Sequence, residues 1–441
     1  MKFGSPQLKP TPSGQLTPEL ASLLKTPRTV SLLGSTGSIG RQGLQVVEHL
    51  NKLAGTRMES PQAAMKVLAL AAGSSSLDLL AEQAVVCAAE LVATSGGAQA
   101  AQELEEAIAA RAKARGYQQY KPIICYGADA ASQAASYGAD VVLNGITGSI
   151  GLQPSLAALA AGSQLALANK ESLIAGGPLV RSAVAASALE QPLIPVDSEH
   201  SALAQALASG SDAEIDRLIL TASGGPFFGM TYQQLSKVTP QQALAHPTWD
   251  MGLVVTTNSA SMVNKALEVL EAHHLFGVDL DKIDVTVHRQ SVVHSMVQFV
   301  DGSTIAQASP PSMLLPIALG LTWPHRIPAA AQSCDWSQAS SWSFEPLDEQ
   351  VFPAVALIKE AGKAGGSYPA VFNAANEEAV TAFHAGAIGF TQILETVRAV
   401  LEQHSSSSAL SKEQELSLAA VLAAEDWARA AAGRVIAAAR A

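Results

Sequence analysis

Two carboxylates, Asp197 and Glu199, stand two residues apart in the stretch PVDSEHSA, directly after an apolar run. Alternate residues of an extended backbone project to the same side, so both side chains would face one way. Two carboxylates held together repel each other unless a cation or a proton joins them. Oxygen ligands of this kind suit Mg²⁺ or Mn²⁺, so the spacing favours a metal site. An acidic loop in contact with solvent is the alternative interpretation.

A predicted helix further along the chain carries a third carboxylate. The stretch NSASMVNKALEVLEAHHLFG at 258–277 has a Ser or Asn cap and a Gly stop, which predict a helix. Asn264 and Glu268 are four residues apart, and Lys265 and Glu268 are three apart, so the three side chains share one face. This set could serve phosphate or hydroxyl groups and a metal together. An ordinary Lys–Glu surface pair has the same spacing.

Two near-identical glycine loops, GSTGSIG at 34–40 and GITGSIG at 145–151, each follow an apolar run and precede a helix-like run. In the first loop, glycine permits a tight turn, and the helix N-terminus offers free N–H groups to a pyrophosphate. Its spacing is GxxGxxG rather than GxGxxG, so an ordinary turn between a strand and a helix is the alternative.

The end of the second predicted strand reads AAGSSS and contains no acidic residue. Sites for NAD usually place Asp or Glu there to hold the ribose hydroxyls. The hydroxyl and N–H groups between Gly73 and Ser76 suit a 2′-phosphate instead, so the sequence favours NADP over NAD. Arg41, just inside the first helix, could supply positive charge.

Polar side chains also follow two other predicted strands. Ser223 precedes two glycines in TASGGPF, where backbone N–H groups could form a nest for an anion. LANKESL places Asn169, Lys170 and Glu171 at a strand end, which is the side of a doubly wound sheet that binds ligands. Both stretches are therefore candidates for ligand contacts.

One loop and two histidines complete the candidate residues. HPTWDMG at 246–252 holds His246 and Trp249. A large aromatic on a mobile loop would act as a lid that excludes water, and an anchor in the core is the alternative. His288 and His294 have the spacing of neither a short metal motif nor a catalytic triad, so we expect structural roles for them.

The elements that must position these residues begin with an alternation of strands and helices. The predicted strands are 29–34, 66–73, 139–146, 164–169 and 192–196, and the predicted helices between them include 41–54, 77–93 and 152–162. This alternation predicts parallel βαβ units of the doubly wound class. The strands are apolar throughout, as expected when helices cover both faces of a sheet.

The second half of the chain has a different pattern. A strand at 216–227 ends in a Gly-Gly-Pro turn, and β-rich runs at 282–309 flank a hairpin turn at Asp301-Gly302. An α+β region therefore follows the α/β one. Residues 324–349 have little periodicity, which is typical of a linker, and the pattern from about 350 is helical.

Composition excludes some classes of protein. The net charge of −11 argues against a nucleic-acid or anionic-membrane surface. Apolar runs stay short of the ~18–20 residues that span a bilayer, and the N-terminus lacks the apolar region of a signal peptide. Cys87, Cys125 and Cys334 lie far apart, which predicts buried free thiols in a reducing cytoplasm.

Taken together and in this order, the motifs closely resemble the 1-deoxy-D-xylulose 5-phosphate reductoisomerase family, NADPH-dependent enzymes of the non-mevalonate isoprenoid pathway. The stretches SASMVNKALE, HRQSVVHSM and NAANEEAV add to the resemblance, which runs from about residue 29 to the C-terminus. It implies an α/β fold with an N-terminal doubly wound Rossmann-like domain, a central α+β catalytic domain and a C-terminal α-helical bundle. The implied segments are a flexible tail (1–28), the NADPH-binding domain (29–196), the catalytic, metal-binding and dimerisation domain (197–322), a linker (323–349) and the helical domain (350–441).

The resemblance also implies a role for each candidate residue. Asp197, Glu199 and Glu268 would bind one divalent metal, Mg²⁺, Mn²⁺ or Co²⁺. The substrate phosphate would be held by Ser223, Ser259, Asn264 and Lys265, and the hydroxyl end by Lys170, Ser198 and Glu199. His246 and Trp249 would belong to the closing loop, and with Lys170 and Glu199 they form the expected catalytic set. NADPH would contact Thr36, Gly37, Ser38, Ile39, Gly73, Ser75, Asn169, Glu171 and Gly252. The loop at 145–151 would border the cofactor without holding its pyrophosphate.

The implied reaction converts 1-deoxy-D-xylulose 5-phosphate to 2-C-methyl-D-erythritol 4-phosphate in a cytoplasmic homodimer. C–C cleavage and rejoining would give an aldehyde, which NADPH reduces, while the metal polarises the substrate oxygens. An NADP-linked dehydrogenase of another phosphorylated carbonyl compound is one alternative. A non-catalytic NADPH-binding regulator is another.

Some positions depart from the family's usual pattern: Val254, Asn258, Ala266 and Arg289 stand where Lys, Asp, Gly and Pro are usual, and Gly73-Ser74-Ser75 stands where a nitrogen-rich GKN-like strand end is usual. The first two changes together would make a charged pair neutral. We expect them to affect the lid and cofactor affinity more than the reaction.

Overall fold

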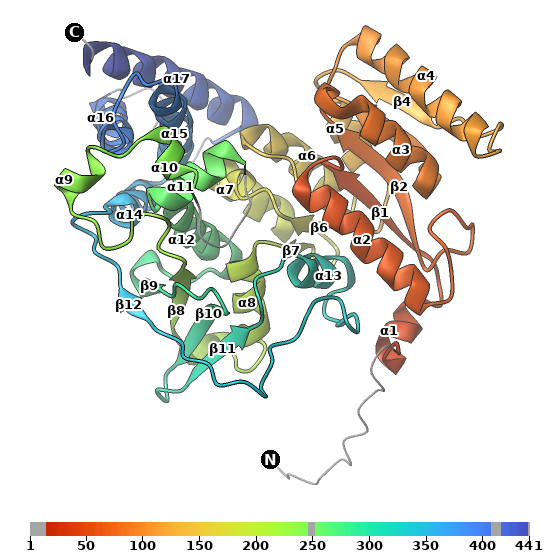
Figure 1. Ribbon diagram of the computed structural model, residues 1–441, viewed down its shortest axis with the longest axis horizontal. Coiled ribbons are helices and arrows are strands. Elements are labelled where there is room, and N and C mark those ends of the chain that lie inside the picture. The colour runs from red at the N-terminus through yellow and green to blue at the C-terminus, as the bar shows by residue number, and fades with distance from the viewer. Residues whose placement is uncertain (1–14, 246–251, 407–415, 440–441) are drawn as a thin grey trace.

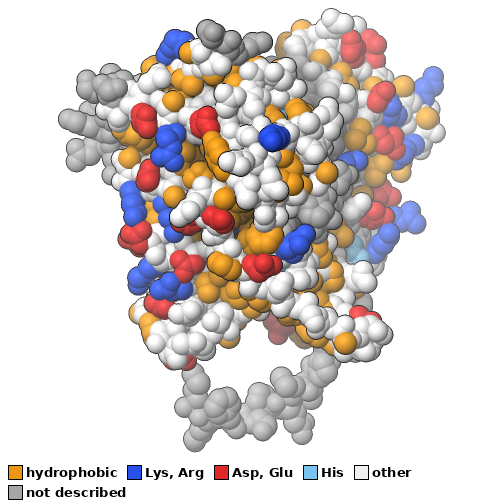
Figure 2. All heavy atoms as spheres, turned by 60° about the vertical axis from the view of Figure 1, so that its left-hand side comes forward, with side chains coloured by type: hydrophobic (Ala, Val, Ile, Leu, Met, Phe, Trp, Pro, Cys, Tyr) orange, Lys and Arg blue, Asp and Glu red, His pale blue; other side chains and the backbone are white. Residues whose placement is uncertain are grey.

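The computed structural model describes residues 15–245, 252–406 and 416–439. Two β-sheets lie side by side, and the C-terminal helices pack beyond the second one (Figure 1). Within these residues, no helix is both long enough and apolar enough to cross a membrane. Charged side chains of both signs are interspersed with hydrophobic ones over the face shown in Figure 2.

The first sheet confirms the doubly wound prediction. Its seven strands pair in parallel in the order β4-β3-β2-β1-β5-β6-β7. The strands are β1 (Arg28–Leu33), β2 (Met65–Ala72), β3 (Leu91–Thr94), β4 (Ile123–Tyr126), β5 (Val141–Asn144), β6 (Gln164–Leu167) and β7 (Leu193–Pro195). Because strand order reverses between β1 and β5, the two glycine loops emerge next to each other at the switch point, where such sheets bind ligands.

Helices cover both faces of this sheet, as the apolar strands require. One face packs against α2 (Ser38–Leu53), α3 (Leu77–Cys87), α4 (Ala98–Ala114) and α13 (Leu314–Thr322). The other packs against α5 (Ala130–Ala135), α6 (Leu152–Ala160) and α7 (Glu171–Ala185). The expected domain boundary is wrong for α13, which was assigned to the catalytic domain. Ile317 and Leu321 of this helix are buried against Val30 and Leu32 of the first sheet.

Two expectations for the N-terminal half are wrong. The helix expected at 77–93 ends at Cys87, because Ala88 takes a left-handed conformation and the chain turns into β3. The tail expected at 1–28 includes a helix, α1 (Pro18–Leu23). Its Leu20 is fully buried in the core of the first domain, so apolar packing orders this part of the chain.

The second sheet has five strands in the order β11-β10-β8-β9-β12. They are β8 (Ile215–Ala222), β9 (Ile283–Val287), β10 (Val293–Phe299), β11 (Thr304–Ala308) and β12 (Glu345–Pro346). The hairpin predicted at Asp301-Gly302 is confirmed between β10 and β11, where Gly302 has φ +86°. The linker prediction is wrong at β12, because this short strand pairs with β9 at the sheet edge.

Helices of the second half share one core with this sheet. They are α8 (Ser198–Leu207), α9 (Tyr232–Leu235), α10 (Pro240–Ala243), α11 (Leu253–Ala260), α12 (Val263–Phe276), α14 (Ala354–Ala364), α15 (Tyr368–His384), α16 (Gln392–Ser406) and α17 (Leu418–Ala439). The helical C-terminal region is therefore confirmed, but its core is continuous with that of the catalytic region. The helix predicted at 258–277 is instead α11 followed by α12, with left-handed Met262 (φ +62°) at the break.

The cysteine prediction holds in part. Cys87, Cys125 and Cys334 are all free. Only Cys87 is buried, while the other two are half-buried.

Candidate functional site

A cavity of about 520 Å³ lies where the carboxyl ends of the first sheet's central strands face the end of β8 and the start of α12. The doubly wound topology explains its position, since parallel strands direct their following loops to one edge. Many of the residues singled out from the sequence line it. These are Gly37, Ser38, Ile39, Lys170, Glu171, Asp197, Ser198, Glu199, Ser223, Gly252, Ser259, Asn264, Lys265 and Glu268.

The structure brings the three predicted metal ligands together. Asp197 follows β7 and caps α8, where its side chain accepts a hydrogen bond of 3.0 Å from the Ser198 backbone N–H. Glu199 lies in the first turn of α8, and Glu268 lies on α12. One carboxylate oxygen from each of the three lies within 4.8 Å of the others. Three hard oxygen donors at this spacing fit a divalent ion.

Two lysine ammonium groups contact these carboxylates. Lys170 Nζ lies 2.8 Å from Asp197 Oδ2 and 3.1 Å from Glu268 Oε1. Lys265 Nζ lies 2.8 Å from Glu199 Oε1 and also contacts Glu268. Asn264 bridges the two groups, since it accepts from Lys170 and donates to Glu268. The carboxylate cluster thus requires positive charge even without an ion, which agrees with a cation site.

Burial and neighbouring charge determine how these acids titrate. Burial, assisted by the charge of Glu199, raises the pKa of Glu268 to about 7. Burial is the largest influence on Asp197 and acts to raise its pKa, but Lys170, His200 and Lys265 together outweigh it, so this pKa is lowered. For Glu199, burial and the charge of Asp197 act to raise the pKa, but the charge and hydrogen bond of Lys265 and the hydrogen bond from Ser198 together lower it. At neutral pH the cluster therefore holds two firmly ionised carboxylates and one that gains a proton readily.

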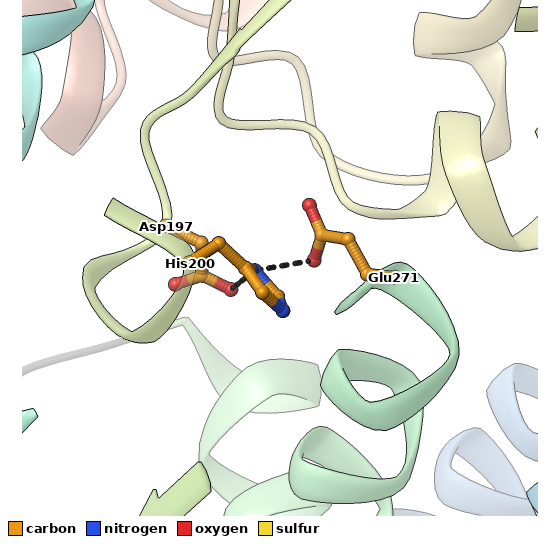
Figure 3. A group of neighbouring side chains, drawn as sticks. All are labelled: Asp197, His200 and Glu271. Carbon is orange, nitrogen blue, oxygen red and sulfur yellow. Dashed lines mark ion pairs between the residues drawn. The ribbon is translucent and has the colours of Figure 1, made fainter. Parts of the chain in front are cut away.

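His200 and Glu271 extend this cluster away from the cavity, and the sequence reasoning missed both. The His200 ring lies between the carboxylates of Asp197 and Glu271 (Figure 3). Its Nδ1 is 3.2 Å from Glu271 Oε2 and 3.9 Å from Asp197 Oδ2. A signal was present, since His200 lies within PVDSEHSA and Glu271 is three residues beyond Glu268.

The candidate phosphate residues meet at another part of the cavity. Gly224 and Gly225, after Ser223, have φ of +80° and +63°, which glycine adopts without strain. A Cβ on Gly225 would lie 2.9 Å from the carbonyl oxygen of Ser259, so the β8 loop and α11 approach closely. This close approach brings Ser223 and Ser259 to the same cavity as Lys265.

Ser291 and His294 are among the residues that line the cavity without having been proposed as ligands. Ser291 has φ +50°, an uncommon conformation for serine. His294, expected to be structural, hydrogen-bonds to the Ser309 carbonyl at 3.1 Å but also lines the cavity. His288 has the structural role expected, because its ring stacks on Phe344 and both nitrogens bond to the backbone.

The first glycine loop has the features of a pyrophosphate site. Gly34 has φ +75°, and a Cβ on Gly40 would lie 2.4 Å from the Gly34 carbonyl oxygen. The α2 helix begins at Ser38, and its N-cap residue Gly37 provides no capping side chain. The N–H groups of this helix N-terminus therefore face the cavity without a competing side-chain cap, which suits an anion.

Side chains of the protein itself tie down the second loop. The Gly148 N–H donates to Glu171 Oε1 at 3.1 Å. Asn169 Nδ2 donates to the carbonyl oxygens of Ile146 and Gly148 and to Glu171 Oε2. Asn169 and Glu171 were both expected to contact NADPH, but these polar atoms form hydrogen bonds with the second glycine loop and with each other. Glu171 also lines the cavity.

Several expected residues lie elsewhere. Thr36, Gly73 and Ser75 are outside the described lining of the cavity, and the last two are exposed at the end of β2. His246 and Trp249, the expected residues of the closing loop, fall outside the described residues.

Three family models match the chain in order. They are described as 1-deoxy-D-xylulose 5-phosphate reductoisomerase (residues 30–177), its C-terminal domain (193–276) and the DXP reductoisomerase C-terminal domain (308–431). A curated relative from Arthrobacter sp. (strain FB24), named 1-deoxy-D-xylulose 5-phosphate reductoisomerase, is 60% identical over 404 residues, covering 92% of this chain and 97% of its own.

The chain belongs to the 1-deoxy-D-xylulose 5-phosphate reductoisomerase family.

Solved structures of reductoisomerases agree with this assignment. The enzyme from Zymomonas mobilis in complex with NADPH is 37% identical, with a TM-score of 0.81 over 93% of this chain and 99% of that one. A reductoisomerase in complex with NADPH, fosmidomycin and magnesium is 32% identical, with a TM-score of 0.79 over 93% of this chain and 98% of that one.

The departures from the reductoisomerase pattern have local explanations. Val254 and Asn258 are one turn apart on α11. Val254 packs against the main core, and Asn258 accepts a hydrogen bond of 2.9 Å from Asn376 of α15. Arg289 lies 5.8 Å from the centre of the Phe228 ring. Ala266 is fully buried.

Proposed function

We infer that this chain catalyses the metal-dependent rearrangement of 1-deoxy-D-xylulose 5-phosphate and its reduction by NADPH to 2-C-methyl-D-erythritol 4-phosphate. This inference rests mainly on the cluster of the half-buried Asp197 and Glu199 with the buried Glu268, in the cavity that also receives the open helix N-terminus after Gly37. A metal site and a phosphate-binding loop in one cavity are what a metal-dependent reductase requires.

Asp197, Glu199 and Glu268 are the proposed ligands of one divalent ion, Mg²⁺, Mn²⁺ or Co²⁺. When bound, the ion supplies Lewis-acid polarisation of the substrate oxygens, and NADPH supplies the hydride. Lys170 and Lys265 now neutralise these carboxylates. We propose that both ammonium groups turn toward substrate oxygens once the ion takes over that charge.

The substrate phosphate has a proposed site on Ser223, Ser259, Asn264 and Lys265. The left-handed glycines after Ser223 and the α11–α12 break bring these donors to the cavity. A phosphate held there is remote from the reacting bonds, so its binding energy is available to orient the reacting end. Lys170, Ser198 and Glu199, together with the loop of His246 and Trp249, are the proposed contacts of that end.

NADPH has a proposed pyrophosphate site at Thr36, Gly37, Ser38 and Ile39. Gly73 and Ser75, at the exposed end of β2, are proposed to face the 2′-phosphate. Gly252, which caps α11 and lines the cavity, completes the proposed contacts. Asn169 and Glu171 are proposed to act on the cofactor by fixing the second glycine loop beside it.

The test is NADPH oxidation with 1-deoxy-D-xylulose 5-phosphate, with and without Mn²⁺, for wild type and Glu268→Gln. Turnover that needs both the metal and Glu268 supports the proposal. Unchanged activity in Glu268→Gln would contradict the metal assignment. Activity that resists EDTA on another phosphorylated carbonyl compound would favour a plain dehydrogenase, and NADPH binding without any turnover would favour a regulator.

A homodimer in the cytoplasm is also proposed. The edge strand β11 presents Thr304 and Ile305 to solvent, and unpaired strand edges are suited to association. The three cysteines remain free thiols, as is usual in a reducing compartment. Sedimentation equilibrium of the full chain tests the dimer, and a mass equal to one chain at micromolar concentration would contradict it.

A further inference from the structure

We propose that Glu271 is a positioning residue, which acts through His200 to hold the carboxylates of α8 and α12 at metal-binding spacing. This inference rests on the proposed metal site. It concerns neither a ligand of the ion nor a contact of the substrate.

The metal-site carboxylates come from two helices that are distant in the sequence. Asp197 and Glu199 stand at the start of α8, which packs on the second sheet beside β10 and β11. Glu268 stands on α12, which packs mainly on α7, α11 and α14. Since α8 and α12 have mainly different neighbours, the spacing of their carboxylates depends on the few contacts that join them.

His200 makes that link at two points on α12. Its Nε2 lies 2.9 Å from the backbone carbonyl oxygen of Glu268. A carbonyl oxygen only accepts, so Nε2 is the donor, and the other nitrogen, Nδ1, faces Glu271 Oε2 at 3.2 Å. The ring is fixed at both nitrogens and therefore cannot rotate without losing one contact. Figure 3 shows it seated between the carboxylates of Asp197 and Glu271.

Burial makes this link strong and sensitive to change. His200 is fully buried, and Glu271 is 1% exposed. Within the described residues, His200 Nδ1 and Glu271 Oε2 make no hydrogen bond to other groups, so their mutual contact is the one that holds them, and Asp197 is the other nearby acid. A buried polar atom that loses its partner keeps the free-energy cost of its removal from water without compensation. Without Glu271, His200 would therefore be free to tilt toward Asp197 and disturb a proposed ligand.

Partners that orient a metal ligand typically change metal affinity by roughly 10–100-fold when they are removed. We therefore expect Glu271→Leu, which keeps volume but no polar atom, to raise the Kd for Mn²⁺ by about this factor. Glu271→Gln can donate to or accept from His200 Nδ1, so it should stay within about threefold of wild type. A matched control is Glu425→Leu, since Glu425 of α17 is also a buried acid but lies outside the cluster.

The measurement is an electron paramagnetic resonance titration of the metal-free full chain with Mn²⁺, with NADPH affinity measured by fluorescence in parallel. Weaker Mn²⁺ binding in Glu271→Leu, recovery in Glu271→Gln and unchanged NADPH affinity in both support the positioning role. Equal Mn²⁺ affinity in all folded variants would overturn it. Two Mn²⁺ ions per wild-type chain, of which Glu271→Leu loses one, would also overturn it, because Glu271 would then be a ligand.

Folding and function are separated by two further measurements. If circular dichroism shows that Glu271→Leu does not fold, His200→Phe is tested in its place. Phenylalanine keeps a ring at this position but removes both nitrogens. Mn²⁺ affinity equal to that of the wild type in His200→Phe would also overturn the proposal. Turnover of 1-deoxy-D-xylulose 5-phosphate is recorded separately. If the wild type binds Mn²⁺ without turning this substrate over, the proposed function fails while the affinity comparison still decides the positioning role.

Discussion

The backbones of Gly34 and Gly145 approach each other closely at the switch point of the first sheet. A Cβ on Gly34 would stand 2.7 Å from the carbonyl oxygen of Gly145, and the Gly145 N–H donates to Leu33, the residue before Gly34. The two loops thus support each other, and the shape of the first depends on glycine in both.

Gly34→Ala should weaken NADPH binding by about tenfold or more, equivalent to roughly 1.4 kcal/mol, because the new methyl group meets backbone. The φ of +75° adds strain. The control is Gly55→Ala, where φ is +70° but a Cβ would meet nothing within 4 Å. Fluorescence titration with NADPH measures both, and equal affinities in the two variants would contradict the role of the close approach.

Lys265→Met should destabilise the metal-free protein by roughly 3–5 kcal/mol, because it leaves the half-buried Glu199 without its lysine and the buried Glu268 with Lys170 alone. Excess Mg²⁺ should restore part of this stability, since the ion binds the folded state. Urea unfolding with and without Mg²⁺ provides the measurement. The control is Lys363→Met, whose partner Asp281 is exposed and which should have little effect. Comparable losses in the two variants would show that burial of the pair is irrelevant.

His274→Gln should make stability less sensitive to acid. Burial, with smaller effects from His273 and Arg181, lowers the pKa of His274 from 6.5 to about 3. Below about pH 6.5, His274 therefore binds a proton in the unfolded chain but stays neutral in the folded chain. The free energy of unfolding of the wild type consequently falls as the pH falls. Near pH 5.5 this effect amounts to about 1.4 kcal/mol. Urea unfolding at pH 7.5 and 5.5 tests it, and the same acid sensitivity in both proteins would refute it.

The pair Val254 and Asn258 should show coupling. Asn258→Asp alone places a charge at a position that is 6% exposed, which should cost about 1–3 kcal/mol. Adding Val254→Lys supplies a cation one helical turn away and should recover part of that loss. Thermal unfolding of the two single variants and the double variant measures the coupling. A double variant less stable than either single variant would argue against a compensated change.

Parts of this structure that depend on local pattern could be predicted from sequence. The strands of the first sheet near the site are apolar runs followed by glycine or polar residues, so β1, β2, β5, β6 and β7 were found. The strands β3 and β4 were missed. Leu91–Thr94 continues an alanine-rich helical pattern, and a turn of three residues, which begins at the left-handed Ala88, separates it from α3. Glycine often marks a left-handed turn in a sequence, but alanine does not, so the end of α3 at Ala88 could not be predicted.

The same distinction applies to the candidate site. Asp197 and Glu199 are close in sequence, and Asn264, Lys265 and Glu268 share a helix face, so each group could be recognised by itself. Their meeting across 66 residues between Glu199 and Lys265 follows from tertiary packing alone. The His200–Glu271 contact was missed for the same reason, because it depends on how α8 lies against α12.

The assignment of α13 to the first sheet has a consequence for motion. The chain passes from the first sheet to the second after β7, returns between β11 and α13, and crosses again between α13 and β12. The first passage contains Asp197, and the second contains Pro311, Ser312 and Met313, all of which line the cavity. Two of the three passages between the sheets therefore form part of the cavity wall, so a rotation of one sheet against the other would act directly on the residues that line the cavity.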